Sequence, residues 1–489
     1  MAGIMVLITI FPPLELRIPY FLSLTKNTMT SLNPPRWVVT TITALIILAS
    51  LAYFLYFPLR VQDGRVSLRC CNPRLCRQIV SGSFTYNGEL NTLSPSQSRA
   101  FPNKRMLLGF GVDNAFTRPN AHHAGIFVQE ARQRIKLAQS EWKDLSIYVQ
   151  EIVKHWMRDR QEEPDPNRQL SEGERGTRVN LADLIQVLSI RIAIETVFDL
   201  DPEQNTRDED ILNLAKAINR TWIETKQEDA DGHGITTFEE NHFLQESLNA
   251  VFRAPDKEAE NPLNWILPSF ETLWRIVLRA FVEIRFMSGI ERPEWRSIMT
   301  AFAKTPSRTQ FELRPVQDEL GGLFKNHSRS STLSTCPSAK DIVMECLRLY
   351  PPTRRVYRAH RGHSNPGIES DYTLVAADIE ACHLEPDIWG PDSESFNPYR
   401  WLMLTHEQKE AFMPFGSRPF ECPARSVFGP RLIGILVGSL LTALESEPAN
   451  IRKGWRLECA NEHVMKTLAT KERLNTDRDA YQDLYLVEF

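Results

Sequence analysis

The chain lacks a strong charge of either sign, any internal repeat, and the cysteine and histidine spacing of a zinc site. Its 489 residues carry a formal net charge of −4, which argues against nucleic acid as a partner. Cys70, Cys71 and Cys76 lie close together, but no histidine or fourth cysteine follows them at zinc spacing. Hydrophobic residues make up 42% of the chain, enough for a substantial core in one large or two ordinary domains.

Charge is absent altogether from residues 37–57, a run of 21 residues. This length matches the roughly 20 apolar residues that a membrane-spanning helix needs. Arginines dominate the next twenty residues, where Asp63 is the single acid, so we expect the part after the run to lie in the cytosol. The sequence therefore predicts a single-pass anchor in the endoplasmic reticulum membrane. The predicted segments are 1–36 before the anchor, with Met29 as an alternative start, the anchor 37–57, and a cytosolic domain 58–489.

The rest of the chain is patterned mainly for helices. Short strand-like runs occur at 353–381 and at Leu484–Val487, where we expect a final edge strand. Two polar stretches, 201–234 and 328–338, predict loops, the first with a short helix. The predicted fold class is mainly α with small β-sheets. The clearest amphipathic helices are expected at 141–158, 180–199, 209–224, 262–286 and 338–350.

One cysteine, Cys422, lies in a loop that cannot form a regular helix. Gly416 gives this loop a flexible point, while Pro419 and Pro423 stiffen it. The apolar run Leu432–Leu441 follows and predicts a buried helix. A loop that enters a helix at a cysteine leaves backbone N–H groups free to stabilise a thiolate. Cys422 is therefore a candidate metal ligand, and the alternative is a buried free cysteine that packs as a small hydrophobe.

Charged residues precede this loop in a fixed order. Glu345 and Arg348 are three residues apart, so they share one face of a helix and can pair. Arg400 follows in an irregular segment, and Phe415 lies seven residues before Cys422. Each feature alone is common, but this order is rare by chance.

This ordered set resembles the cytochrome P450 superfamily, the haem-thiolate monooxygenases. The resemblance covers essentially everything after the first sixty residues and is strongest from Ile342 to Leu441. It implies the cytochrome P450 fold, with a single large haem-binding domain behind the membrane helix. It also implies that Cys422 ligates the haem iron and that Phe415 belongs to the haem-binding loop. The buried structural triad implied by the resemblance consists of Glu345, Arg348 and Arg400.

Three positions around the cysteine depart from the family pattern. The family usually has glycine four residues before the cysteine, arginine two before and glycine two after, whereas this chain has Arg418, Phe420 and Ala424. Because the family's arginine binds a haem propionate, our hypothesis is that Arg418 takes that role, with Arg358 as a second candidate. The family's tryptophan and arginine near the propionates are also missing, and the segment 120–136 is the expected replacement.

An acid beside an alcohol, Glu271–Thr272, lies in the helix expected at 262–286. The resemblance implies that this pair lies on the oxygen-binding side of the haem and relays protons from solvent. Ser269 stands where glycine is usual, and Pro268 predicts a kink that opens a groove for oxygen and water. Such dipeptides are common, so a pair without a catalytic role is the alternative.

The resemblance implies a monooxygenase that inserts one oxygen atom from O₂ into an apolar small molecule. Its electrons would come from NADPH through a membrane-bound flavoprotein reductase. The divergent cysteine loop resembles that of the family's fungal branches that act in secondary metabolism, so terpenoids or polyketides are the expected substrates. Two alternatives stay open: a haem-thiolate enzyme of rearrangement or dehydration that needs no external electrons, and a membrane-tethered scaffold that no longer binds haem.

Overall fold

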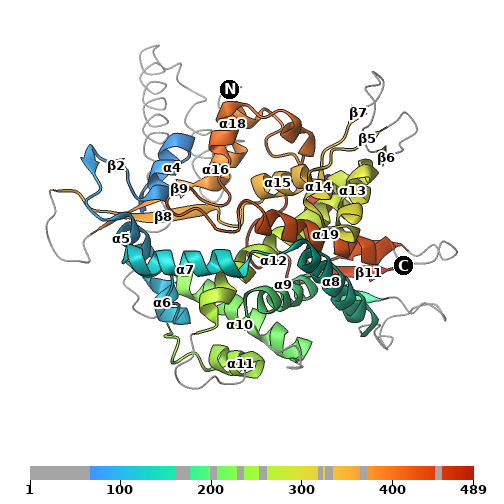
Figure 1. The fold of residues 1–489 in the computed structure, drawn as a ribbon, viewed down its shortest axis with the longest axis horizontal. Coiled ribbons are helices and arrows are strands. Elements are labelled where there is room, and N and C mark those ends of the chain that lie inside the picture. Colours follow the sequence, from blue (N-terminus) through green and yellow to red (C-terminus); the bar gives the residue numbers. More distant parts are fainter. Residues whose placement is uncertain are drawn as a thin grey trace, which may run out of the picture. The chain divides into compact units, whose positions relative to one another are not determined.

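The computed structural model describes nine stretches of the chain, and helices dominate them (Figure 1). The predicted anchor at 37–57 and the segment before it lie outside the described residues. The strands are short, which confirms the predicted class, mainly α with small β-sheets. The described residues are 66–159, 177–198, 206–227, 236–252, 261–317, 323–324, 334–363, 372–445 and 454–489.

The five helices predicted as amphipathic are confirmed within a few residues of their expected ends, as α8, α9, α10, α12 and α15. However, α9 is buried over most of its surface and not on one face alone. The first predicted loop is wrong in part, because α10 fills most of it with 20 helical residues. The α-helices are α4 Pro73–Ser81, α5 Pro95–Ala100, α6 Lys104–Phe110, α7 Ala121–Arg134, α8 Gln139–Asp159, α9 Leu181–Val197, α10 Asp208–Gln227, α11 His242–Phe252, α12 Leu263–Phe286, α13 Pro293–Lys304, α14 Arg308–Glu312, α15 Ala339–Leu349, α16 Ile379–Leu384, α17 Pro386–Trp389, α18 His406–Ala411, α19 Phe428–Glu445 and α20 Glu462–Thr470. Three 3₁₀ helices are η3 Phe101–Asn103, η4 Ser288–Glu291 and η5 Pro398–Leu402.

The strands form small sheets whose partners are often far apart in the sequence. One sheet has the order β1-β9-β8, with β1 parallel and β8 antiparallel to β9. Another has the order β10-β11-β4, and two further small sheets have the orders β2-β3 and β6-β5-β7. The strands are β1 Val66–Cys70, β2 Thr85–Tyr86, β3 Glu89–Leu90, β4 Arg178–Asn180, β5 Val316–Gln317, β6 Leu323–Phe324, β7 Ser334–Thr335, β8 Arg355–His360, β9 Thr373–Asp378, β10 Trp455–Glu458 and β11 Tyr485–Glu488.

The expected edge strand near the C-terminus is β11, and its predicted edge position is wrong. β11 pairs antiparallel with β10 on one side and with β4 on the other, so it is the central strand of its sheet. β4 has only three residues and carries no strand pattern of its own. The partner on the second side could therefore not be seen in the sequence.

Helix α12 runs through the core and packs against α9, α19 and α15 (Figure 1). It continues through Pro268, which has no N–H to bond the carbonyl of Asn264 one turn earlier. The Asn114 side chain donates to that carbonyl at 3.0 Å. At this carbonyl, the hydrogen bond from Asn114 therefore replaces the one that is lost at the proline. The carbonyl is not left open to the groove that the sequence predicted for oxygen and water.

Among the described helices, α19 alone is long and apolar enough to cross a membrane. Its apolar window is 78% buried within the protein. This burial is typical of a core helix. It agrees with the buried helix expected after the cysteine loop.

Candidate functional site

The loop that carries Cys422 is closed by backbone hydrogen bonds just before α19. The N–H of Cys422 donates to the carbonyl of Phe415 at 2.9 Å. Gly416 has a φ of 73°, a left-handed conformation that favours glycine, at the turn between them. A Cβ at Gly429, in the first turn of α19, would lie 3.1 Å from both the Phe415 ring and the Ala424 carbonyl oxygen. The loop is thus held tightly against the start of the helix.

The Cys422 thiol is free and its side chain is exposed. Desolvation by the surrounding protein nevertheless raises its pKa, while a hydrogen bond from the backbone N–H of Ala424 acts in the opposite direction. A side chain that is both accessible and desolvated fits a sulfur that faces a recess rather than the outer surface. Cys422 is therefore not packed into the core as a small hydrophobe. A cation bound at this sulfur would favour the thiolate form.

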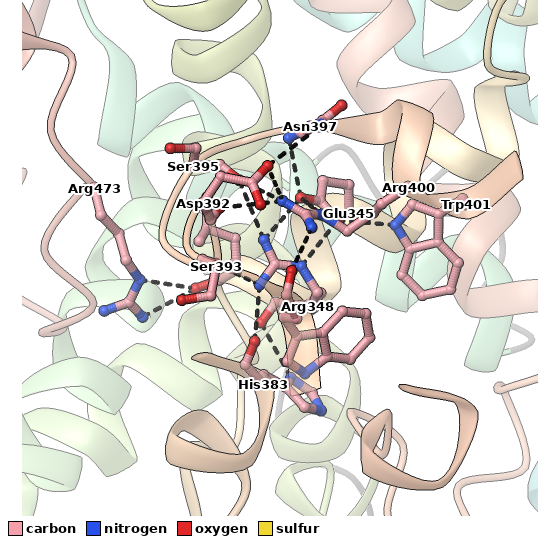
Figure 2. Close-up of polar contacts among 12 residues, drawn as sticks. Glu345, Arg348, His383, Asp392, Ser393, Ser395, Asn397, Arg400, Trp401 and Arg473 are labelled. Carbon is pink, nitrogen blue, oxygen red and sulfur yellow. Dashed lines mark hydrogen bonds and ion pairs between the residues drawn. The ribbon is translucent and has the colours of Figure 1, made fainter. Parts of the chain in front are cut away.

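Figure 2 shows a charged network centred on the carboxylate of Glu345. Arg348 donates to both of its oxygens, at 2.9 and 2.8 Å. Arg400 donates at 3.0 Å, Trp401 at 2.9 Å and the N–H of Asn397 at 3.0 Å. Glu345 and Arg348 have no exposed side-chain surface, and Arg400 is nearly buried. The structure therefore brings the three residues of the predicted triad together, with the carboxylate fully hydrogen-bonded.

His383, which Figure 2 shows in this network, connects the network to the cysteine loop. Nε2 of His383 accepts the N–H of Met413 at 3.0 Å, so its Nδ1 carries the proton and donates to the carbonyl of Arg348 at 3.0 Å. Burial, and then the charge of Arg348, lower the pKa of His383 to about 3. Met413 accepts the N–H of Gly416 at 3.0 Å, which ties the neutral imidazole to the turn before Cys422. The remaining N–H groups of Arg348 donate to the carbonyls of His383, Ser393 and Ser395.

The two arginines predicted to bind a propionate lie in different environments. Arg358 is buried and donates to the carbonyls of Val80 and Tyr357, but it has no carboxylate partner among the described residues. Desolvation first, and then the charge of Arg99, lower the pKa of Arg358. Arg418 is exposed and makes no hydrogen bond or ion pair with the part of the chain that the structure describes.

Arg99, on the short helix α5, is a residue that the sequence did not single out. Its guanidinium lies 3.9 Å from the ring centroid of Phe420, and that of Arg358 lies 5.3 Å from the same ring. Arg99 is buried, and its Nε has no hydrogen-bond partner among the described residues. Phe420 stands where the family has arginine, so two cations from other elements lie at the position where one is missing from the motif. No motif surrounds Arg99, so the sequence alone could not reveal it.

The segment proposed as the replacement for the tryptophan and arginine pair is α7. Arg134 on this helix forms an ion pair with Glu130, donates to the carbonyl of Val197 and lies 4.4 Å from the ring centroid of Trp265. Arg132 is exposed. None of these contacts involves the Cys422 loop.

The acid–alcohol pair lies on α12, away from the triad. Glu271 is buried and forms an ion pair with Arg478 through one oxygen. Its other oxygen has no hydrogen-bond partner among the described residues and is free to accept one. Thr272 is half-buried and donates weakly to the carbonyl of Pro268, at 3.4 Å. The pair therefore offers one hydroxyl group and one carboxylate oxygen without a partner, on a carboxylate that Arg478 holds in place.

Comparison with known proteins matches part of this chain to one family. Residues 313–448, which include the triad and the Cys422 loop, match the family model of Cytochrome P450. Over these residues the chain is similar to the cytochrome P450 family. Cytochrome P450 52A9 of Candida maltosa is 33% identical over 103 residues, 19% of this chain and 20% of that protein. Benzoate 4-monooxygenase bphA of Aspergillus niger is 29% identical over 132 residues, 24% of this chain and 25% of that protein.

The matched stretches thus span about a fifth to a quarter of these P450 relatives. Among solved structures, the heme domain of a cytochrome P450DA mutant covers 79% of this chain and 82% of its own, at 15% identity. Its TM-score is 0.44, too low to support a structural argument.

The residues present fit the thiolate-bound haem of P450 proteins. The Cys422 sulfur is accessible and receives an N–H hydrogen bond, as an iron-bound thiolate requires. The orphaned Nε of Arg99 beside Phe420 fits a carboxylate that the protein itself does not supply. The two features meet at one loop, because Phe420 is two residues before Cys422.

Proposed function

We propose that this chain is a haem-thiolate monooxygenase in which Cys422 ligates the haem iron. The observation that carries the proposal is the accessible Cys422 thiol, held at the start of α19 with the Ala424 N–H directed at it. Bound haem would supply the activation of O₂. Phe415 supports the loop because its ring lies against Gly429 and its carbonyl accepts the Cys422 N–H.

Arg99 and Arg358 would hold the haem propionates. Both are buried cations without a carboxylate partner among the described residues, and an unpaired buried charge is unfavourable until an anion reaches it. Arg418 is the third candidate, on the exposed side of the loop.

Glu271 and Thr272 would move protons. Insertion of one oxygen atom from O₂ into a C–H bond consumes two electrons and two protons, and releases the second oxygen atom as water. The buried oxygen of Glu271 that has no hydrogen-bond partner among the described residues would take up a proton, and the Thr272 hydroxyl would take part in the same relay. Arg478 holds the carboxylate in place through its other oxygen.

The electrons would come from NADPH through a membrane-bound flavoprotein reductase. Residues 37–57 would anchor the protein in the endoplasmic reticulum membrane with its catalytic part in the cytosol. The substrate would be a small, largely apolar molecule of secondary metabolism, such as a terpenoid or polyketide. The fungal origin of two P450 relatives, from Candida maltosa and Aspergillus niger, supports this choice.

The absorption spectrum of the reduced, carbon-monoxide-treated protein tests the proposal. We expect the band of a thiolate-ligated haem in the native chain and its loss in Cys422→Ser. Cys459→Ser is the matched control, because Cys459 is also a free and partly accessible cysteine. Absence of the band from the native chain would overturn the proposal. Consumption of NADPH with reductase and substrate then separates a monooxygenase from an enzyme that needs no external electrons.

A further inference from the structure

A group of cationic side chains gathers around Trp222 near the end of α10. Around its ring, the guanidinium carbons of Arg105 and Arg478 lie 4.8 and 4.9 Å from the centroid, and the Lys226 amine lies 5.8 Å from it. Arg275 and Arg354 belong to the same group of cations, because the positive charges of all four arginines help to lower the pKa of Lys226. We call this set the Trp222 cluster: Trp222, Arg105, Lys226, Arg275, Arg354 and Arg478.

The described residues supply too few carboxylates to neutralise this cluster. Glu271 forms an ion pair with Arg478, and Asp477 forms one with Arg354 at 3.0 Å. The other three cations have no carboxylate ion pair within the described part of the chain. Cations that are brought together without counter-ions repel one another, and an anion would remove that repulsion.

The three cations without an ion pair also keep hydrogen-bonding capacity. Arg105 makes one side-chain hydrogen bond, to Thr225 at 3.1 Å. Arg275 donates to two backbone carbonyls, but its buried Nε has no partner among the described residues. Lys226 makes no hydrogen bond with the described residues. These N–H groups are the donors that a carboxylate or phosphate accepts most strongly.

The cluster is desolvated yet accessible. Burial, followed by the charges of four arginines, lowers the pKa of Lys226 to about 8, and burial lowers the pKa values of Arg105 and Arg275. Even so, Lys226 is exposed and Arg105 is only half-buried. Groups that are surrounded by protein but still accessible can be reached by a ligand.

We infer that the Trp222 cluster binds an anionic oxygen group, a carboxylate or a phosphate, on the substrate, so that the substrate is an organic anion. The Trp222 ring gives a flat apolar surface for the part of the molecule next to that group. The link to the substrate rests on the proposed function, because Glu271 belongs both to the proton relay and to the ion pair with Arg478. The site would orient the molecule by its charged end and leave its apolar remainder for oxidation.

Calorimetric titration of the purified full-length protein tests the inference with three probes of similar shape: benzoate, phenyl phosphate and benzamide. We expect at least one anion to bind about tenfold or more tightly than neutral benzamide. The stronger of the two anions identifies the group. Equal affinity for all three probes, or no binding of either anion at about 10 mM, would overturn the inference.

Charge variants locate the binding. Arg105→Gln and Lys226→Gln should each weaken anion binding about tenfold. Arg220→Gln and Lys216→Gln are the matched controls, because both cations lie on α10 with largely exposed side chains. The affinity of these two variants for the anion should not change. Glu271→Gln should strengthen binding, because it removes the competing carboxylate. A damaged fold cannot produce this gain, and an equal loss in all five variants would contradict the inference.

Failure of this inference and failure of the proposed function give different results. Calorimetry with benzoate does not depend on the carbon-monoxide spectrum. A thiolate-haem band without anion selectivity overturns the anion site alone. Anion selectivity that depends on Arg105, without that band, overturns the haem proposal and keeps the site.

Discussion

At the scale of single residues, the site around Phe420 shows how a motif position can be replaced from elsewhere in the chain. The family's arginine would stand at this position, two residues before the cysteine. Here the aromatic ring lies against the guanidinium groups of Arg99 and Arg358 instead. Cation–π contacts of this kind hold a guanidinium in place and leave its N–H groups free to bind an anion. The positive charge is thus supplied from other parts of the chain.

We predict that Arg99→Gln lowers haem affinity about tenfold or more, because it removes a charge-assisted hydrogen bond to a propionate. The readouts are haem content after purification and haem titration of the stripped protein. Arg74→Gln is the control, because its side chain is 81% exposed and lies in the next helix towards the N-terminus, α4. Full haem content in Arg99→Gln, together with loss in Arg418→Ala, would assign the propionate role to Arg418.

His383 makes stability depend on pH. Its folded pKa of about 3 lies below the ordinary value of 6.5, so the unfolded chain binds the proton more readily. The stabilisation is therefore fully present above about pH 6.5 and is lost as the pH falls towards 3. We predict that the unfolding free energy falls by about 1 kcal/mol per pH unit between about pH 6 and 5 from this residue.

Chemical denaturation across this pH range checks the prediction. His383→Gln should be less stable overall, because its hydrogen bonds to Arg348 and Met413 change, but its pH dependence should be flatter. His406→Gln is the control, since His406 is exposed and should leave the slope unchanged. An unchanged slope in His383→Gln would show that other groups cause the pH dependence.

At the scale of elements, the contact between α15 and η5 depends on one buried carboxylate. Arg400 pairs with Glu345, which has no exposed side-chain surface, and with Asp392, whose side chain is 47% exposed. We predict that Glu345→Gln lowers the unfolding free energy by about 3–5 kcal/mol, because two buried arginines lose their counter-charge. Asp392→Asn is a matched change to the same arginine and should lower it by less than about 1 kcal/mol. Denaturant midpoints of the two variants give the comparison, and equal losses would contradict the assigned role of burial.

The sequence predicted those helices whose pattern of apolar residues lies within the helix itself. The apolar periodicity of α12 and α15 lies within the helix itself, so the sequence shows it. The central place of β11 depends on β4, about three hundred residues away, and three residues of strand carry no periodicity. The charged triad could be predicted because its members keep a motif order. Arg99 and the Trp222 cluster could not, since their residues meet only in the folded chain.

At the scale of the whole molecule, the segment just after the predicted anchor is part of the folded unit. β1 pairs parallel with β9, and Arg69 on β1 forms an ion pair with Asp378, whose side chain is 1% exposed. The compact unit that contains the site spans residues 63–489. The first strand therefore joins the sheet that includes β8, the strand of Arg358.

Two deletions separate the role of the anchor from that of this strand. Removal of residues 1–62 should shift the protein from the washed membrane fraction to the soluble fraction and leave its thermal midpoint unchanged. Removal of residues 1–72 should lower that midpoint by several degrees, because β9 loses its parallel partner and α4 loses the side-chain cap of Asn72. Among the described residues, Asp378 would then keep one cationic partner, Arg355 at 3.3 Å, besides the Ala381 N–H. Membrane association that survives the shorter deletion would contradict the predicted anchor, and equal midpoints would contradict the structural role of β1.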